Sequence, residues 1–462
     1  MKRLVIYSLL FCSLLSVTGC SDFLEKEPPL YITENDVYTD SERLEGAVTG
    51  LYLALKDPYF MGGKAAIVID NIGDEMVNVS GNGYEALMSY EMSVGLTTQE
   101  NSQTWQYAYL TINKVNTFLK NLEASKEYAG DKYNQYVAEA KFVRAMCYYY
   151  LHQIYTMPYK MGSSALSVPL RLNAESDITN NDLARSTSKE VLDQILADLS
   201  ESDALPSGGN TYSLVTRATQ GAAEMLKMRV YMVMEDWGNA IKAGEKVKGY
   251  KLLSNVTTVF RSPYISEEAI FSLPMSSTNH PDNQFALGYF YYDGTSIVLD
   301  KQSNIMSIPG YGLSEDARIS GLTDGVILKK FIDGVTFDDW VPLFRYAETL
   351  LDLSECYYNN NEPGKARAAL LEVRRRSVPA SADPIDVANL SGDALKTAIY
   401  NEKRAEFVGE AIRPFDQRRR AETIVKQKGT IGELSVGPEL KTNGYIWPIP
   451  QSERSQNKLI TD

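Results

Sequence analysis

The sequence predicts a mostly α-helical protein whose scaffold consists of helical hairpins, with irregular loop-rich inserts and a few short strands. Apolar residues recur at helical spacing over most of the chain, and short polar turns separate the helical segments. The segment EDWGNAIKAGEKVKGY, residues 235–250, has the aromatic-x-x-alanine start of tetratricopeptide helices. Because the spacing between hairpins is irregular, we expect a degenerate tetratricopeptide-like α-α superhelix instead of a regular solenoid.

The first twenty residues have the pattern of a lipoprotein signal. Lys2 and Arg3 precede an apolar run, and small residues lead to Cys20. The run is about fourteen residues, shorter than the roughly 20 that span a bilayer as a helix. We therefore predict a signal peptide over 1–19, lipid attachment at Cys20, a tether over 20–30 and one domain over 31–462. An ordinary secretory signal with a coincidental cysteine is the alternative.

Charge restricts the range of partners. The chain of 462 residues has a formal net charge of -13, and no basic stripe offsets this acidity. Binding to nucleic acid requires Lys and Arg that neutralise phosphates, so nucleic acid is excluded as an expected partner. Sulfated or uronic-acid polymers are also disfavoured, unless a local basic group overrides the overall charge.

The helical pattern begins near Ser41. A stripe from Leu44 to Leu55 predicts a helix over 41–56, and Asp57-Pro58 ends it. Residues 60–98 are predicted to be irregular. Two amphipathic stripes, Trp105–Leu119 and Ala140–Ile154, predict helices that pack antiparallel. Thr187 and Glu190 have capping-box spacing at the start of a helix over 188–201.

The second half alternates helices with one long insert. Residues 250–341 are rich in aromatic residues and in Gly, Ser, Asn and Pro, and this composition predicts a loop-rich insert. Further segments complete the scaffold: helices over 217–234, 237–247 and 342–358, a polar turn at 359–361, a helix from Pro363, a helical stretch over 391–420 and an extended piece over 445–450.

Catalytic and metal-binding motifs are absent from the sequence. His152 and His280 are too few for a three-histidine zinc site, and no HExxH, paired CxxC, GxSxG, P-loop or GxGxxG occurs. We therefore expect no enzyme activity and no cofactor. His152 is interpreted as a packed helix residue.

Asn78, Ser80 and Asn82 imitate an EF-hand start without its glutamate, so only a looser calcium site stays open. A Cys147–Cys356 disulfide also stays open.

Aromatic residues in the insert point to a carbohydrate ligand. Flat rings contact the apolar faces of sugars, and neighbouring amides and carboxylates bind the hydroxyl groups. The segments 289–296 and 337–340 have this mixture, and packing under a long loop is the alternative. The candidate ligand-binding residues here are Tyr289, Tyr291, Tyr292, Tyr311, Trp340, Asn283 and Asp338. A glycosidase would need two placed carboxylates, and acids such as Asp70, Asp74, Glu75 and Asp339 are too numerous to indicate one pair.

The C-terminal third carries a family resemblance. Residues 399–420, IYNEKRAEFVGEAIRPFDQRRR, contain a glutamate-arginine pair, a phenylalanine, Gly-Glu, an arginine and a phenylalanine-aspartate-x-x-arginine. This pattern resembles the SusD/RagB family of nutrient-binding outer-membrane lipoproteins of Bacteroidetes. Other blocks resemble the family in the same order, among them AEAKFVRAMCYYYLHQIY, EEAIFSLP and YIWPIPQSE. The acids and arginines of the C-terminal block are interpreted as partly buried ion pairs and helix caps that lock the last helices: Glu402, Arg404, Glu406, Glu410, Arg413, Asp416 and Arg418.

The resemblance implies a function. It implies a lipid-anchored protein on the cell surface of the outer membrane that binds glycan or another nutrient and caps a TonB-dependent SusC-like transporter. Family members hold ligand in variable loops, which by position places candidate contacts near Tyr84 and within 280–340. Two alternatives stay open: a structural lid of the transporter with little ligand affinity, and a surface glycosidase.

Overall fold

The structure is a computed structural model, and it describes residues 37–82, 86–177, 181–300, 305–426, 434–437 and 444–460. The predicted signal peptide, Cys20 and the tether lie outside these residues, so those predictions stay predictions. None of the described helices combines the length and hydrophobicity needed to cross a membrane.

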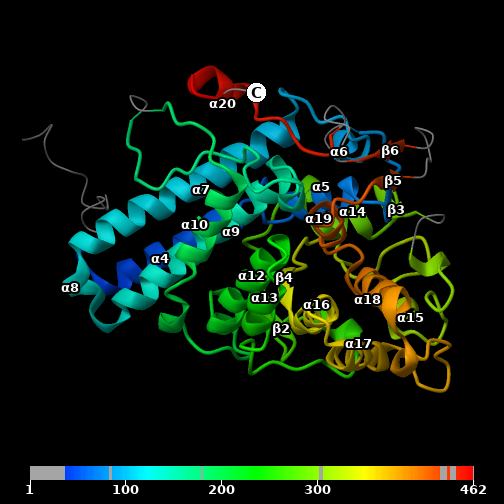
Figure 1. The fold of residues 1–462 in the computed structure, drawn as a ribbon. Coiled ribbons are helices and arrows are strands. Elements are labelled where there is room, and N and C mark those ends of the chain that lie inside the picture. Colours follow the sequence, from blue (N-terminus) through cyan, green and yellow to red (C-terminus); the bar gives the residue numbers. More distant parts are fainter. Residues whose placement is uncertain are drawn as a thin grey trace, which may run out of the picture.

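The scaffold is helical, as predicted, and its helices pack as consecutive hairpins (Figure 1). α7 lies beside α9, and a short connection joins the end of one to the start of the other, so the two run antiparallel. α12 packs on α13, and α16 packs on α17. The scaffold helices are α4 (Ser41–Leu55), α7 (Gln99–Ala124), α9 (Tyr133–Tyr155), α10 (Ser188–Asp198), α12 (Gln220–Val233), α13 (Trp237–Gly244), α16 (Tyr346–Asn359), α17 (Pro363–Ser377) and α18 (Gly392–Phe407).

Local sequence signals start several of these helices. The capping box of α10 is present, because Thr187 accepts from the backbone N–H of Glu190 while the Glu190 carboxylate accepts from that of Thr187. Asp40 caps α4 by accepting from the N–H groups of Glu42 and Arg43. Pro363 lies in the first turn of α17, where its missing N–H costs no helical hydrogen bond.

Short elements complete the fold. The described strands form three antiparallel pairs: β1 (Met76–Asn78) with β3 (Ile297–Leu299), β2 (Ala269–Leu273) with β4 (Val341–Arg345), and β5 (Ile424–Lys426) with β6 (Leu434–Val436). The remaining α-helices are α5 (Lys64–Ile72), α6 (Leu87–Tyr90), α8 (Lys126–Ala129), α11 (Tyr212–Thr216), α14 (Leu287–Tyr291), α15 (Ala317–Leu322), α19 (Arg413–Arg419) and α20 (Gln451–Gln456). The 250–341 insert therefore contains the short strands β2 and β3 and also two short helices, α14 and α15, which were not predicted.

Three boundaries differ from prediction. The segment 60–98 was predicted to be irregular but contains α5, which is buried on nearly every side and so shows no amphipathic period. Residues 341–345 form β4 instead of the start of a helix, because they pair with β2. The predicted stretch 391–420 divides at Gly409 and Ala411, whose φ angles of 81° and 60° interrupt a right-handed helix.

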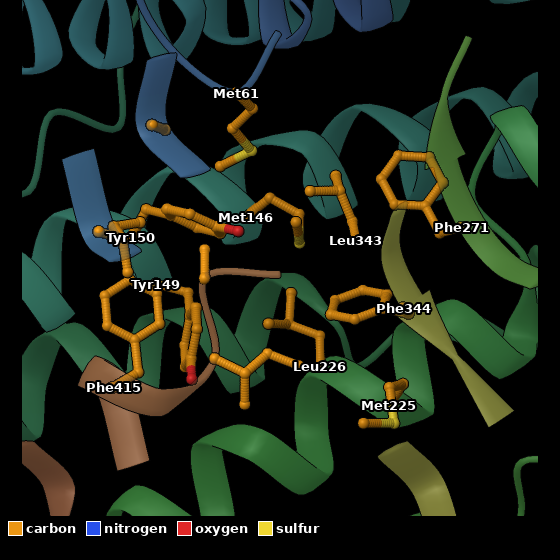
Figure 2. Close-up of a cluster of buried hydrophobic side chains, with 14 of the residues drawn as sticks. Met61, Met146, Tyr149, Tyr150, Met225, Leu226, Phe271, Leu343, Phe344 and Phe415 are labelled. Carbon is orange, nitrogen blue, oxygen red and sulfur yellow. The ribbon is translucent and has the colours of Figure 1, made fainter. Parts of the chain in front are cut away.

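One continuous core joins the scaffold to the insert. Figure 2 shows Met146, Tyr149 and Tyr150 of α9 facing side chains of α12, β2, β4 and α19. Phe271 of β2 packs edge-on against Phe142 of α9, with 5.3 Å between ring centroids. Since these elements come from distant parts of the chain, the insert is fixed to the helical scaffold by shared apolar burial.

A buried ionic network adds to this core. Arg345 of β4 donates to Glu268, Glu406 and Glu410 at 2.6–2.9 Å, and all four side chains are almost fully buried. Lys330 donates to Glu410 at 2.6 Å. The prediction of ion pairs is confirmed for six of the seven C-terminal residues: Glu402, Arg404, Glu406, Glu410, Arg413 and Asp416.

Arg418 differs from the other six residues, because it binds a carbonyl in the last turn of α9 instead of forming an ion pair. Its guanidinium donates to the backbone carbonyl of Gln153 at 2.9 Å and forms no ion pair with a described residue. Burial lowers its pKa to about 10. The sequence pattern could not predict this partner, because every residue has a backbone carbonyl and no residue type marks the one that accepts the hydrogen bond.

Candidate ligand-binding cleft

A cleft of about 430 Å³ lies between α4, α11 and the segment that follows β2. This volume is within the range of small-molecule binding sites. Leu53, on α4, is one of the exposed apolar side chains at the cleft. The lining residues are Thr49, Tyr52, Leu53, Lys56, Tyr212, Ser213, Thr216, Arg217, Leu273, Pro274, Met275, Ser276 and Asn279.

Helical spacing and a tight turn present these side chains. The four contributions of α4 and its C-cap fall at positions 49, 52, 53 and 56, which share one helix face. Tyr212 and Thr216 share a face of α11 in the same way. After β2, Ser276 and Asn279 close a turn by exchanging backbone hydrogen bonds of 3.2 and 3.0 Å. The cleft therefore joins residues about 220 positions apart in the sequence.

The floor of the cleft carries a neutralised guanidinium. Arg217 donates to both carboxylate oxygens of Glu139, at 2.8 and 2.9 Å, and also to Glu45. Burial would raise the pKa of Glu45, but hydrogen bonds from Arg217, Lys132 and Tyr136 lower it to about 2. The carboxylates of Glu139 and Glu45 thus occupy the guanidinium of Arg217, which leaves little of its charge for a ligand.

Lys56 has a different environment. Its side chain is 9% exposed, and its Nζ donates to the backbone carbonyl of Asn279 at 2.8 Å. Burial lowers the pKa of Lys56 to about 8. No described residue forms an ion pair with it. The wall of the cleft therefore holds an ammonium group that no carboxylate among the described residues balances.

Tyr212 of the cleft lining packs on two further rings, Trp340 and Tyr264, that lie outside the lining, and we call these three residues the aromatic wall. Tyr212 is 56% exposed, and its ring meets Trp340 edge-on at a centroid distance of 5.7 Å. Trp340 stacks on Tyr264 at 5.4 Å, and its indole N–H donates to the carbonyl of Met275 at 3.0 Å. Buried Trp340 and half-buried Tyr264 therefore support one exposed ring at the cleft, an arrangement suited to the apolar face of a sugar.

A second aromatic group lies farther along the same two segments. Tyr59 stacks on Tyr107 with 5.1 Å between centroids and meets Phe285 edge-on at 4.5 Å. Tyr59 follows Lys56 by three residues, and Phe285 follows Asn279 by six. All three rings are half-buried. This aromatic group does not line the cleft itself.

The predicted ligand residues do not gather at one place. Trp340 is the member of the set whose described contacts include cleft-lining residues, Tyr212 and Met275. Tyr292 is 51% exposed beside Gly334, and Tyr289 is half-buried against Phe290. Asp338 lies in a turn closed by its own N–H, which donates to Asp333 at 2.9 Å. Tyr84 and the Asn283 side chain lie outside the described residues, and their roles stay predictions.

Tyr291 and Tyr311 correct the prediction of ligand contact, because both rings are in the core. The Tyr291 hydroxyl donates to Asp70 at 2.7 Å, and burial raises the pKa of Asp70 to about 7. Tyr311 donates to the carbonyl of Ala398 at 3.1 Å beneath the guanidinium of Arg374. Each hydroxyl satisfies a buried polar group, so each tyrosine acts as a packing residue.

Other sequence candidates also have defined environments. His152 is buried with Nε2 2.8 Å from the Ser188 hydroxyl, so its interpretation as a packed histidine is confirmed. Cys147 and Cys356 are free and buried, so no disulfide joins them. Asn78 accepts from the N–H and hydroxyl of Ser80, which forms a local turn. The described residues contain no group of three or more His, Cys, Asp or Glu side chains that could hold a metal ion.

Acids considered for hydrolysis have structural partners. Arg413 pairs with Asp74 at 2.9 Å, and Arg404 pairs with Glu75 at 2.6 Å. Sequence reasoning missed Tyr212 and Lys56 as candidate contacts in the cleft. One signal was present: Leu53 lies outside the apolar stripe of its helix, where an apolar side chain must face solvent or a ligand.

Comparisons with known families match both halves of the chain. Residues 22–232 match a family model described as "Starch-binding associating with outer membrane". Residues 282–462 match the model of the SusD family. The curated SusD-like protein P25 of Formosa agariphila is 22% identical over 90% of this chain and 89% of its own length.

Solved structures agree with these matches. A SusD superfamily protein of Bacteroides fragilis is 50% identical, with a TM-score of 0.90 over 92% of this chain and all of that chain. A SusD-like carbohydrate binding protein of Bacteroides vulgatus shares the fold at 19% identity, with a TM-score of 0.75 over 91% of this chain and 97% of that one. On these matches, this chain belongs to the SusD/RagB family.

Proposed function

We propose that this protein is a cell-surface lipoprotein of the outer membrane that binds oligosaccharide in the cleft and passes it to a TonB-dependent SusC-like transporter. The aromatic wall is the observation that carries the proposal. Its exposed ring, Tyr212, lies beside hydroxyl and amide groups in a cleft of ligand size. The starch-binding description of one matching family and the name of the Bacteroides vulgatus neighbour support the same ligand class.

Binding by this cleft predicts a specific effect of Tyr212→Ala. Burying an apolar side chain contributes about 1.5–3 kcal/mol, so loss of the ring should weaken glycan binding roughly tenfold or more. Titration calorimetry of the full chain against a panel of host and plant glycans measures this. The matched control is Tyr128→Ala, which removes another exposed tyrosine, on α8, away from the cleft. Equal weakening by both variants, or by neither, would count against this cleft as the glycan site.

The transporter partnership has its own test. A protein that closes over a transporter should be recovered with it when outer membranes are solubilised in mild detergent. We expect the tagged chain to co-purify with an outer-membrane protein of transporter size, in wild type and in Tyr212→Ala alike, because glycan binding and docking use different surfaces in this proposal. Recovery of the chain alone would remove the transporter from the proposal and leave glycan binding untouched.

A further inference from the structure

Lys56 is the feature of the cleft that a neutral sugar does not explain. Some buried cations have carboxylate partners, such as Lys330 with Glu410 at 2.6 Å, whereas buried Arg418 and Lys426 donate to backbone carbonyls and do not line the cleft. Lys56 has the carbonyl of Asn279 as its hydrogen-bond acceptor and no ion pair with a described residue. An ammonium group carries three donors, so Lys56 can offer two more to a ligand.

We infer that the cleft selects glycans that carry a carboxylate, such as oligosaccharides containing uronic acid, and that the ammonium group of Lys56 binds this carboxylate. The inference rests on the proposed function, because it assigns a ligand class to the same cleft. Lys56 was not among the binding residues predicted from the sequence. The net charge of -13 disfavours anionic ligands for the chain as a whole.

The charge distribution of the cleft supports a ligand with an acidic group. A buried, unbalanced charge is unfavourable, and a ligand that brings the opposite charge removes that cost. The second cation at the cleft, Arg217, is already held by Glu139 and Glu45. Lys56 is therefore the cationic group that remains to attract an anion into this cleft.

The chemistry of the lining favours a carboxylated sugar over a sulfate or phosphate ester. Sulfate and phosphate groups carry three outer oxygens and are commonly bound by several donors or by a free arginine fork. Here the available donor is the single ammonium group of Lys56 among apolar and hydroxyl side chains. The guanidinium of Arg217 already binds both carboxylate oxygens of Glu139. A sugar ring on Tyr212 with one carboxylate directed to Lys56 matches this combination.

The position of Lys56 makes this contact specific. Its Nζ is fixed by the carbonyl of Asn279, which belongs to the turn that also carries Ser276. The ammonium and the Tyr212 ring belong to the same lining, on α4 and α11 respectively. A ligand that fills this cleft can contact both groups, and the low exposure of Lys56 strengthens its attraction for an anion relative to bulk water.

The test compares each acidic glycan with its carboxyl-reduced form. Calorimetry of the full chain at low salt uses oligosaccharides of polygalacturonate, alginate and hyaluronan, each beside its neutral reduced form, together with sulfated carrageenan oligosaccharides. We expect at least one carboxylated glycan to bind roughly tenfold or more tightly than its reduced form, as a charge-assisted hydrogen bond should provide.

Three variants assign the effect to Lys56. Lys56→Met keeps the length of the side chain and should bring the ratio of the two affinities to about one. Lys56→Arg should keep a clear preference for the acidic form. Lys120→Met, which removes an exposed lysine of α7, should keep the full wild-type ratio. Thermal unfolding verifies that each variant is folded.

Different failures have different meanings. An unchanged ratio in Lys56→Met, or tighter binding of the sulfated oligosaccharides than of every carboxylated one, overturns the assignment of Lys56 to a carboxylate. Equal binding of acidic and reduced forms by the wild-type protein also overturns it, while glycan binding stands. Absence of binding to every neutral and acidic glycan overturns the proposed function itself.

Discussion

Replacing Glu406 by glutamine should lower the free energy of unfolding by about 3–5 kcal/mol, the cost of breaking a buried ion pair from one side. Glu406 is fully buried and accepts from Arg345, Arg376 and Arg318. Burial would raise the pKa of Glu406, but these three guanidinium groups hold it well below its usual range. The glutamine NH₂ group would face arginine donors, so charge and hydrogen bonding are lost together.

Urea unfolding followed by circular dichroism measures this effect. The control is Glu362→Gln, which removes the carboxylate of an exposed pair with Lys365 at the start of α17 and should leave the unfolding midpoint unchanged. An unchanged midpoint for Glu406→Gln would mean that the remaining carboxylates of the network, Glu268 and Glu410, rearrange to balance the arginines.

This network also shows how far the sequence predicts the fold. The acids and arginines of residues 399–420 alternate with apolar residues, and the prediction that they form buried ion pairs was correct except for Arg418. The helices with caps and amphipathic stripes were predicted for the same reason, because their signals are local. α10, which has both a stripe and a capping box, begins at the predicted residue.

Errors occurred where tertiary contacts decide the structure. α5 has apolar residues on nearly every side because other elements surround it, so the sequence gives no period to detect. β4 is extended because it pairs with β2, about seventy positions earlier in the chain. Local pattern reasoning does not include such partners, and it therefore continued the following helix backwards through Pro342.

The cleft was beyond sequence reasoning for a similar reason. Lys56, Tyr212 and Met275 come from three separate segments, and none of those segments carries a binding motif. Counting aromatic residues selected Trp340, Tyr291 and Tyr311 alike, although all three side chains are buried and the structure connects Trp340 to the cleft through Tyr212 and Met275. Composition detects a surplus of aromatic residues, whereas only packing decides which ring faces solvent.

Trp340 should affect both stability and glycan binding, because it connects the insert to the cleft. Its ring is 9% exposed, stacked on Tyr264 and edge-on to Tyr212. Trp340→Ala should lower the free energy of unfolding by about 3–5 kcal/mol, as truncation of buried aromatic residues does. Glycan affinity should fall as well, because Tyr212 loses the ring that fixes its orientation.

Two further variants separate the effect on stability from the effect on glycan affinity. Unfolding is measured for each variant, and calorimetry is carried out below its unfolding transition. Trp340→Phe keeps an aromatic ring but loses the hydrogen bond to the carbonyl of Met275, so its losses should be smaller on both measures. Trp237→Ala removes a half-buried tryptophan of α13 that does not line the cleft, and it should lower stability without changing affinity. If Trp340→Ala and Trp237→Ala behave alike in calorimetry, the orientation of Tyr212 does not depend on Trp340. A loss of glycan affinity in Trp340→Ala but not in Trp237→Ala would instead show that the buried Trp340 ring sets the position of the exposed Tyr212 ring.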